Sequence, residues 1–153
     1  MNLETIIDKI REIILRDFET EAATLFTDGG EPELDPVVDE SIVAFDFDID
    51  KNKRGLMLFL LPEAEQVERI TIEGEESTQG VSVYIICRND TPANLYKKVL
   101  RYSRAFRDMI RGNNTLDGIA GDSYVTNAEY FHAVEGNPAI KGAELQITVE
   151  VDD

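Results

Sequence analysis

The stretch TPANLYKKVLRYSRAFRDMIRG, residues 91–112, decides the fold because it combines a helix start, an apolar stripe and a helix end. Thr91 and Pro92 are residue types favoured at the N-cap and at the first helical position. Apolar side chains then recur at intervals of four and three residues, the spacing of one helix face, at Leu95, Val99, Tyr102, Phe106 and Met109. Gly112 and the two asparagines after it suit a helix end. The stretch therefore predicts an amphipathic helix that packs one side on a core.

The other side of this helix is basic. It carries Lys97, Arg101, Arg104, Arg107 and Arg111, with Lys98 on its flank. Six of the 15 lysines and arginines thus fall within fifteen positions, and only Asp108 opposes them there. Such a face is either a solvated surface or one that meets an acidic partner.

A second amphipathic helix is predicted at the N-terminus. Its apolar residues also recur at three and four, at Leu3, Ile6, Ile7, Ile10, Ile13, Ile14 and Phe18. Asn2 is a suitable N-cap. Leu25 and Phe26 extend the pattern, and Asp28-Gly29-Gly30 is expected to end it.

An acidic segment follows, with nine Asp and Glu residues and no Lys or Arg between residues 28 and 50. Residues 28–40, which include Pro32 and Pro36, are predicted to form an acidic loop or insertion. Residues 42–49 alternate apolar and acidic and predict a half-buried strand.

Three acids in this segment have a spacing found in calcium sites. Asp46, Asp48 and Asp50 match the start of an EF-hand loop, but Lys51 and Met57 stand where that loop needs glycine and glutamate. Acids at every second residue also share one face of a strand. We therefore favour a solvated strand face over a metal site.

The remaining strands are expected at residues 55–61, 67–73, 80–88, 123–134 and 141–151. Short polar connectors at 62–65, 74–79 and 135–138 suggest antiparallel hairpins. The order of elements predicts a single α+β domain over residues 1–153. It consists of a mainly antiparallel β-sheet with two amphipathic helices packed on one face.

Composition limits the function. The net charge of −16 argues against tight nucleic-acid binding, and the longest apolar run, residues 56–61, is too short to cross a membrane. The N-terminus shows no signal-peptide pattern. Cys87 and His132 are the only residues of their types, which supplies zinc sites and catalytic triads poorly. We expect Cys87 in the core, His132 at the surface, no cofactor or metal, and no enzymatic activity.

The fragment Gly118-Ile119-Ala120-Gly121 raises the question of a phosphate-binding loop. Such loops leave a strand and lead into a helix N-terminus, where backbone amides converge on the anion. Here the order is reversed, because the fragment leaves the basic helix and enters a strand. We interpret it as a joint, with Leu116 and Ile119 filling the core.

The C-terminal half resembles the tail terminator proteins of long-tailed bacteriophages and prophages, also called tail completion or tail-to-head joining proteins. The resemblance covers roughly residues 80–151. It rests on the helix NLYKKVLRYSRAFRDMIR, the loop Asn-Thr-Leu-Asp-Gly, a strand with Glu-Tyr-Phe, and the closing pattern Gly-Ala-Glu-Leu-x-x-x-Val-Glu-Val. Its sharpest pieces are Thr115-Leu116-x-Gly118 and Gly142-Ala143-Glu144-Leu145.

This resemblance implies a small α+β virion protein without catalysis. Such proteins form a homo-oligomeric ring, expected to be a hexamer, that caps the tail tube and offers a docking face to the head connector. The implied partners are copies of the chain itself, the tail tube protein and a head-completion or connector protein. The implied location is the head-tail junction of the virion, after assembly in the host bacterial cytoplasm, with DNA passing through the ring and no membrane.

Two further hypotheses follow from the charge pattern. In a ring, the basic helix face of one subunit, with Lys97, Arg101, Arg104, Arg107 and Arg111 as interface residues, would meet an acidic surface on its neighbour. Surplus acid would face the channel and repel DNA phosphates. The alternatives are another phage neck or tail tube protein, and an acidic adaptor module that uses residues 28–50 to bind a basic protein.

Overall fold

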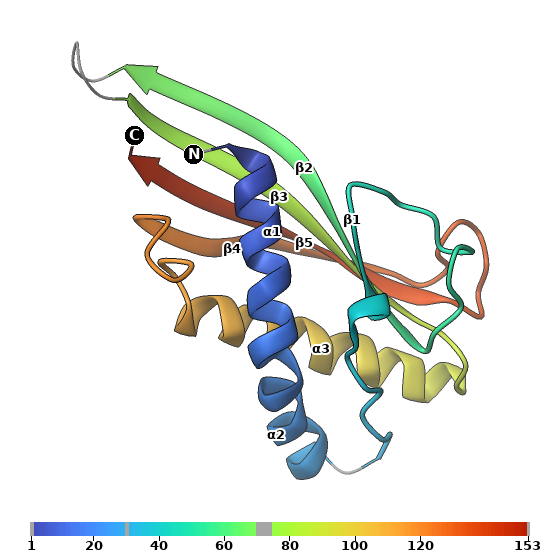
Figure 1. Cartoon of the computed structure of the whole chain (residues 1–153). Helices are drawn as coiled ribbons and strands as arrows, with labels where there is room; N and C mark the ends of the chain where they lie inside the picture. The colour runs from blue at the N-terminus through green and yellow to red at the C-terminus, as the bar shows by residue number, and fades with distance from the viewer. Residues whose placement is uncertain (1, 30, 70–74, 153) are drawn as a thin grey trace.

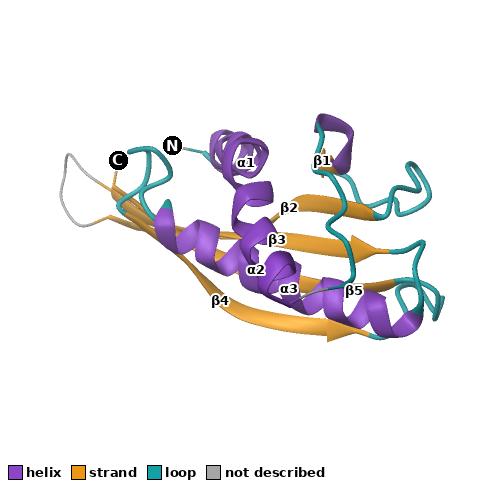
Figure 2. Ribbon diagram, turned by 90° about the horizontal axis from the view of Figure 1, so that it is seen from below, coloured by secondary structure: helices purple, strands orange, loops and turns teal. Residues whose placement is uncertain are grey.

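The structure, a computed structural model, describes residues 2–29, 31–69 and 75–152, and confirms the α+β class. One sheet has the strand order β1-β2-β3-β5-β4, and the helices lie together on one of its faces (Figures 1 and 2). Every strand pair is antiparallel except the pairing of β1 with β2. The expected arrangement of a mainly antiparallel sheet with helices on one face is therefore confirmed.

The N-terminal helix is one continuous helical stretch in three segments. It comprises α1 (Leu3–Ile13), the π-helical segment η1 (Ile14–Phe18) and α2 (Glu19–Gly29). Asn2 caps it as predicted, because its side chain accepts a hydrogen bond from the backbone N–H of Thr5 at 2.9 Å. The π-helical segment was not predicted, and Asp28 lies within α2, so the acidic loop begins later than residue 28.

The second helix, α3 (Pro92–Gly112), begins at the predicted N-cap Thr91. Its apolar face packs on strands β3, β4 and β5. All five predicted seam residues, Leu95, Val99, Tyr102, Phe106 and Met109, are buried. Phe18 of η1 lies between the rings of Tyr102 and Phe106, at centroid distances of 5.8 and 6.0 Å, so the two helices share one core.

The strand predictions between residues 42 and 88 need correction. Strand β1 (Ile42–Ala44) ends early because Phe45 adopts a positive φ of 64°, so residues 46–50 are not on a strand. The predicted strands 55–61 and 67–73 belong to one long strand, β2 (Leu56–Arg69), and β3 (Glu75–Cys87) begins within the second predicted connector. A bulge between Pro62 and Ala64 accommodates the proline. Residues 70–74, which belong to the predicted strand 67–73 and the start of the connector after it, lie outside the described part of the chain.

The last two strands, β4 (Asp122–Phe131) and β5 (Lys141–Asp152), agree closely with the prediction. β4 is shorter than expected, since residues 132–140 form a loop around the isolated bridge between Val134 and Asn137. This loop and residues 45–55 cover part of the second face of the sheet. A small apolar cluster there includes Ile49, Met57, Phe59, Val134 and Ile140.

The joint between α3 and β4 depends on left-handed backbone. Leu116, Asp117 and Gly118 have φ values of 49°, 59° and 93°. Leu116 is fully buried, and this burial offsets the unfavourable φ of its backbone. Arg16 stabilises the turn by donating hydrogen bonds to Asp117 Oδ2 at 2.8 Å and to Asn113 Oδ1 at 2.9 Å. This arginine lowers the pKa of Asp117.

We predict that Gly118→Ala destabilises the fold and that Gly121→Ala does not. A Cβ at residue 118 would carry the strain of φ 93°, which costs about 1 kcal/mol. A Cβ at residue 121 would only touch the carbonyl oxygen of Glu150 at 3.5 Å, an ordinary contact. Urea unfolding of both variants measures the difference, and equal losses would contradict this account of the joint.

Candidate functional site

The predicted basic residues of α3 do not form one uniform surface. Lys97, Arg104, Arg107 and Arg111 are exposed. Arg101 is half-buried, because its Nη1 donates to the carbonyl of Glu31 at 3.2 Å and its guanidinium lies 5.4 Å from the centre of the Phe26 ring. Arg101 therefore also fastens the end of α2 and the acidic loop to α3.

Lys98 departs furthest from the sequence interpretation. The spacing places it on the flank of the basic face, but its side chain is only 6% exposed and its Nζ lies 3.0 Å from carboxylate oxygens of both Asp35 and Asp90. Burial disfavours the charged amine, but the hydrogen bonds to Asp90 and Asp35 outweigh it and raise the pKa of Lys98. The backbone N–H of Asp35 also donates to the hydroxyl of buried Tyr102 at 2.8 Å.

Two carboxylates of the acidic loop thus pair with cations within the fold. Besides Asp35, the carboxylate of Asp39 accepts from Arg11 at 2.6 Å. Both contacts draw the loop onto the helices, and neither partner could be found from sequence, since Asp35 and Lys98 are 63 positions apart.

The exposed arginines have little acid to pair with on their own helix. Asp108 is 3.5 Å from Arg104 and 3.7 Å from Arg111, and ion pairs this exposed stabilise weakly. In the described part of the chain, Lys97 and Arg107 form no ion pair. The outer side of α3 therefore keeps a local excess of positive charge on a chain of net charge −16.

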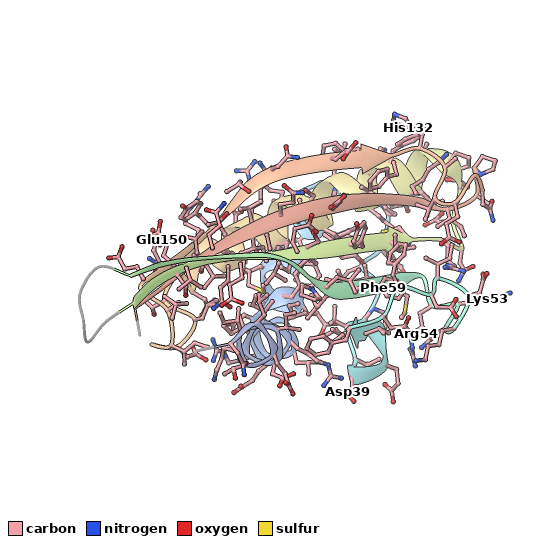
Figure 3. All side chains as sticks on the ribbon, turned by 90° about the horizontal axis from the view of Figure 1, so that it is seen from above. Asp39, Lys53, Arg54, Phe59, His132 and Glu150 are labelled. Carbon is pink, nitrogen blue, oxygen red and sulfur yellow. The ribbon has the colours of Figure 1, made fainter. Side chains whose placement is uncertain are left out.

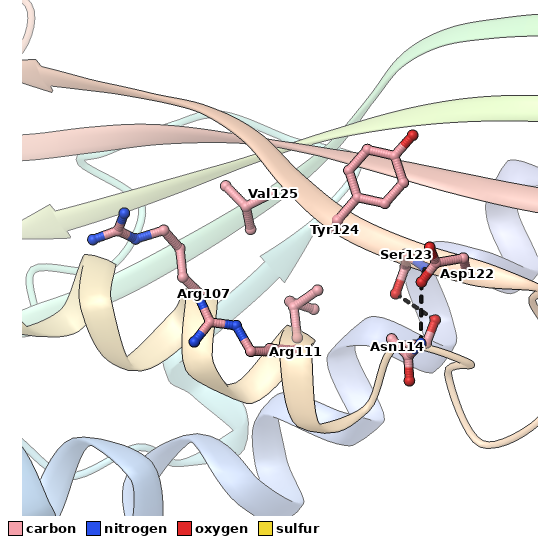
Figure 4. A pocket seen from close by; sticks show the side chains of 8 residues that line it. Arg107, Arg111, Asn114, Asp122, Ser123, Tyr124 and Val125 are labelled. Atoms are coloured by element: carbon pink, nitrogen blue, oxygen red, sulfur yellow. Dashed lines mark hydrogen bonds between the residues drawn. The ribbon is translucent and has the colours of Figure 1, made fainter.

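A groove separates the end of α3 from the start of β4 (Figure 4). It has a volume of about 390 Å³, and Arg107 and Arg111 extend along its helical side while Tyr124 and Val125 come from the strand. Its end is fixed by Asn114 and Asp122, whose side chains are hydrogen-bonded at 3.1 Å. The groove offers two guanidinium groups beside the outer edge of a strand, which suits a carboxylate-bearing segment.

An apolar patch continues this surface toward the start of α3. Tyr96, Leu100 and Tyr130 are 40%, 54% and 40% exposed. They line a smaller cavity of about 220 Å³ together with Phe131 and His132. Exposed aromatic and aliphatic side chains beside arginines are the composition typical of the centre of a protein–protein interface.

The opposite face of the sheet is acidic. Glu129 and Glu144 are direct cross-strand partners on β4 and β5, and like charges placed so are destabilising. Glu63 and Glu144 both lie near the hydroxyl of Ser82, at 2.7 and 3.3 Å. Burial and the nearby glutamates raise the pKa of Tyr84 on the same face. Glu150 lies on this face as well (Figure 3), and none of these four glutamates forms an ion pair in the part of the chain described.

The joint Gly118–Gly121 offers no amides to an anion. The N–H groups of Gly118 and Ala120 donate to the carbonyl of Thr115, and that of Gly121 donates to Glu150 at 2.9 Å. The phosphate-loop interpretation fails because these donors are already used within the chain.

The other singled-out residues lie outside these surfaces. Cys87 is buried in β3 as predicted, and burial raises the pKa of its thiol. His132 is exposed beside Tyr96, as predicted. Asp46, Asp48 and Asp50 lie in a loop, and within the described residues no group of three or more His, Cys, Asp or Glu side chains could hold a metal ion. None of the helices described is long and apolar enough to cross a membrane.

Comparisons with known proteins identify no family for this chain. No protein-family model and no curated protein sequence matches this chain. Among solved structures, a chain of the virion of a native gene transfer agent particle is similar, with a TM-score of 0.44 and 10% sequence identity over 92% of this chain and 95% of that one. A likeness at this level carries no argument about what this chain does.

We predict that removing the amine of Lys98 unfolds the acidic loop and destabilises the domain. Lys98→Ala leaves Asp35 and Asp90 without their cation, and since both are partly exposed we expect a loss of about 2 kcal/mol. Lys97→Ala, one position away and exposed, is the matched control and should change little. Urea unfolding measures both, and equal stability of the two variants would refute the role of Lys98.

We predict an acid-dependent loss of stability through Asp90. Hydrogen bonds from Asn94 and Lys98 lower the pKa of this carboxyl to about 2 from its ordinary value of 3.8. A lowered folded-state pKa gives stability that is present above pH 3.8 and is lost as the pH falls toward 2. Asp90→Asn should therefore flatten the fall in unfolding free energy between pH 5 and 2. Asp50→Asn, which removes a carboxylate that pairs with no cation among the described residues, should leave the slope unchanged. Parallel slopes for Asp90→Asn and the parent chain would show that Asp90 is not responsible.

Proposed function

We propose that this chain is a non-enzymatic virion protein that caps the tail tube of a long-tailed phage as a homo-oligomeric ring and joins it to the head connector. The proposal rests on the sequence resemblance of residues 80–151 and on one structural observation. That observation is the separation of charge between the two sides of one sheet, with exposed arginines on the helical side and unpaired glutamates on the other.

The charge separation is costly in an isolated subunit. Glu129 and Glu144 face each other across β4 and β5, and no described cation relieves them. In a ring whose channel is lined by this open sheet face, the unpaired glutamates have a function. Glutamate carboxylates along the channel repel DNA phosphates, so that DNA passes without binding.

The helical side suits contacts between subunits. The arginines of α3, the groove beside β4 and the apolar patch of Tyr96, Leu100 and Tyr130 all lie along α3. A ring needs two different surfaces that fit each other, since its contacts are heterologous and close by rotation. The basic residues Lys97, Arg101, Arg104, Arg107 and Arg111 belong to one of these surfaces in this proposal.

The expected size is a hexamer, with the tail tube protein below the ring and a head-completion or connector protein above it. The adaptor alternative is weakened by the geometry of the acidic loop. Asp35 and Asp39 are used inside the fold by Lys98 and Arg11, which leaves fewer carboxylates for a basic partner.

We predict a specific defect when the gene is disrupted in the phage or prophage that carries it. Without the cap, tails should vary in length and stay unjoined to heads, and supplying the chain from a plasmid should restore uniform, joined particles. Electron microscopy of the lysates measures tail length and the fraction of joined particles. Uniform joined tails after disruption would refute the proposal.

Microscopy of the purified chain separates the neighbouring functions. Discrete rings favour a terminator, and spontaneous long tubes would instead favour a tail tube protein. A monomer that binds an added lysine-rich peptide would favour the adaptor.

A further inference from the structure

Two edges of the sheet are open in the described part of the chain, and they differ in chemistry. The outer edge of β4 has no strand beside it. On the other side, β1 pairs only with Leu58, Phe59 and Leu60, so β2 beyond Leu60 also has a free outer edge. Open edges of this length favour pairing with another strand.

The free part of β2 is acidic and exposed. Residues 62–67 are all exposed and carry Glu63 and Glu65 without any lysine or arginine. Val67 adds an apolar side chain that is 54% exposed. The groove beside β4, by contrast, carries Arg107 and Arg111. The two edges are therefore complementary in charge.

The register places these complementary groups at the same height of the sheet. Tyr124 on β4 pairs with Thr148, Thr148 pairs with Gly80, and Gly80 pairs with Ala64 on β2. Tyr124 lines the arginine groove, and Ala64 lies between Glu63 and Glu65. A neighbouring copy set beside the first at the same height would bring the outer edge of its β2, with Glu65, to the groove.

The directions of the strands and side chains also agree. Three successive antiparallel pairings from β2 through β3 and β5 make β4 antiparallel to β2. A second copy in the same orientation would thus offer β2 antiparallel to β4. Glu65 pairs with Gln79, which is buried and shares the helical side of the sheet with Val81 and Val83, the side on which α3 also lies. Glu63 lies on the opposite face, beside Ser82, so Glu65 is the glutamate that faces the arginines.

We propose that the outer edge of β2 pairs with β4 of a second copy of this chain, so that Glu65 meets the Arg107–Arg111 groove on the helical side of the sheet. The inference rests on the proposed function, because it names the two surfaces that would join in the ring. The sheet then continues from copy to copy, with the helices on one side and the glutamate face on the other. Each junction closes both free edges and brings an exposed glutamate to arginines that have little acid beside them in the single chain.

The test exchanges the charges. Native mass spectrometry at about 10 µM compares the parent chain with R107E/R111E, with E65K, and with the variant that combines all three substitutions. Either change alone places like charges at the junction and should weaken association about 100-fold or more, so that monomers dominate. The combined variant restores opposite charges and should assemble again.

A matched control changes the same charge elsewhere. Lys53 and Arg54 are exposed at the end of the sheet opposite Glu150 (Figure 3), and K53E/R54E should assemble like the parent chain. Circular dichroism melting of every variant shows whether its fold is retained. Three results would each overturn the contact. They are assembly of both reversed variants, a folded combined variant that stays monomeric, and a parent chain that is monomeric even at about 1 mM.

A cross-link gives an answer that does not depend on charge reversal. Arg111→Lys keeps the charge and introduces an amine that a carbodiimide can join to a carboxylate in direct contact. In a mixture of 15N-labelled and unlabelled chains, a bond from this amine to Glu65 of a chain with the other label supports the contact, and its absence in assembled material refutes it. The gene disruption tests the function independently of this contact. If the chain forms rings through other surfaces, the contact is refuted but the capping function is not. If the contact is found but tails are normal after disruption, only the function is refuted.

Discussion

The ammonium group of Lys98 is the interaction on which the arrangement of the helices and the acidic loop depends. It is buried under the loop that follows α2 and is held by Asp35 from that loop and Asp90 from the start of α3. Asp35 in turn binds Tyr102 in the centre of the helix–sheet core and lies so close to Gly55 that a Cβ there would be 2.8 Å from its Oδ1. One cation therefore connects the N-terminal half of the chain, the strand entry at β2 and the helix α3.

This arrangement also explains how so acidic a chain folds into one domain. Cations of α3 and the N-terminal helix form ion pairs with the carboxylates that lie close to the core. Lys98 pairs with Asp35 and Asp90, Arg11 with Asp39, and Arg16 with Asp117. The glutamates left without partners lie on the open sheet face and on the outer edge of β2, where water solvates them. The exposed arginines of α3 remain on the far side of the sheet from the glutamates of the open face.

Much of the fold could be predicted from sequence because its signals are local. The seam from Leu95 to Met109, the caps at Asn2 and Thr91, and the alternation of β5 each depend on residues within one element. The errors arose where distant contacts decide. Pro62 and its neighbouring glutamates resemble a turn, but a proline is tolerated on an open edge and the bulge beside it absorbs the misfit. Helical spacing places Lys98 only on the flank of the basic face, and the loop that the fold brings over it is what buries it.

The candidate surfaces were predictable only in part. Helical spacing is enough to place Arg104, Arg107 and Arg111 on one side of α3. The groove that two of them line also needs β4, which the chain reaches only after the left-handed turn at Leu116–Gly118. The acidic edge of β2 needs the knowledge that β1 stops at Ala44, and that depends on the backbone of Phe45, which no periodicity reveals.

The placement of the chain ends has a practical meaning. The first turn of α1 and the last residues of β5 lie close together, at the end of the sheet toward which β2 runs (Figures 1 and 2). The loops at residues 45–55 and 132–140 lie at the other end. An affinity tag or a fluorescent fusion at either terminus would therefore occupy the same end of the molecule, and the loop end would stay unobstructed whichever terminus is chosen.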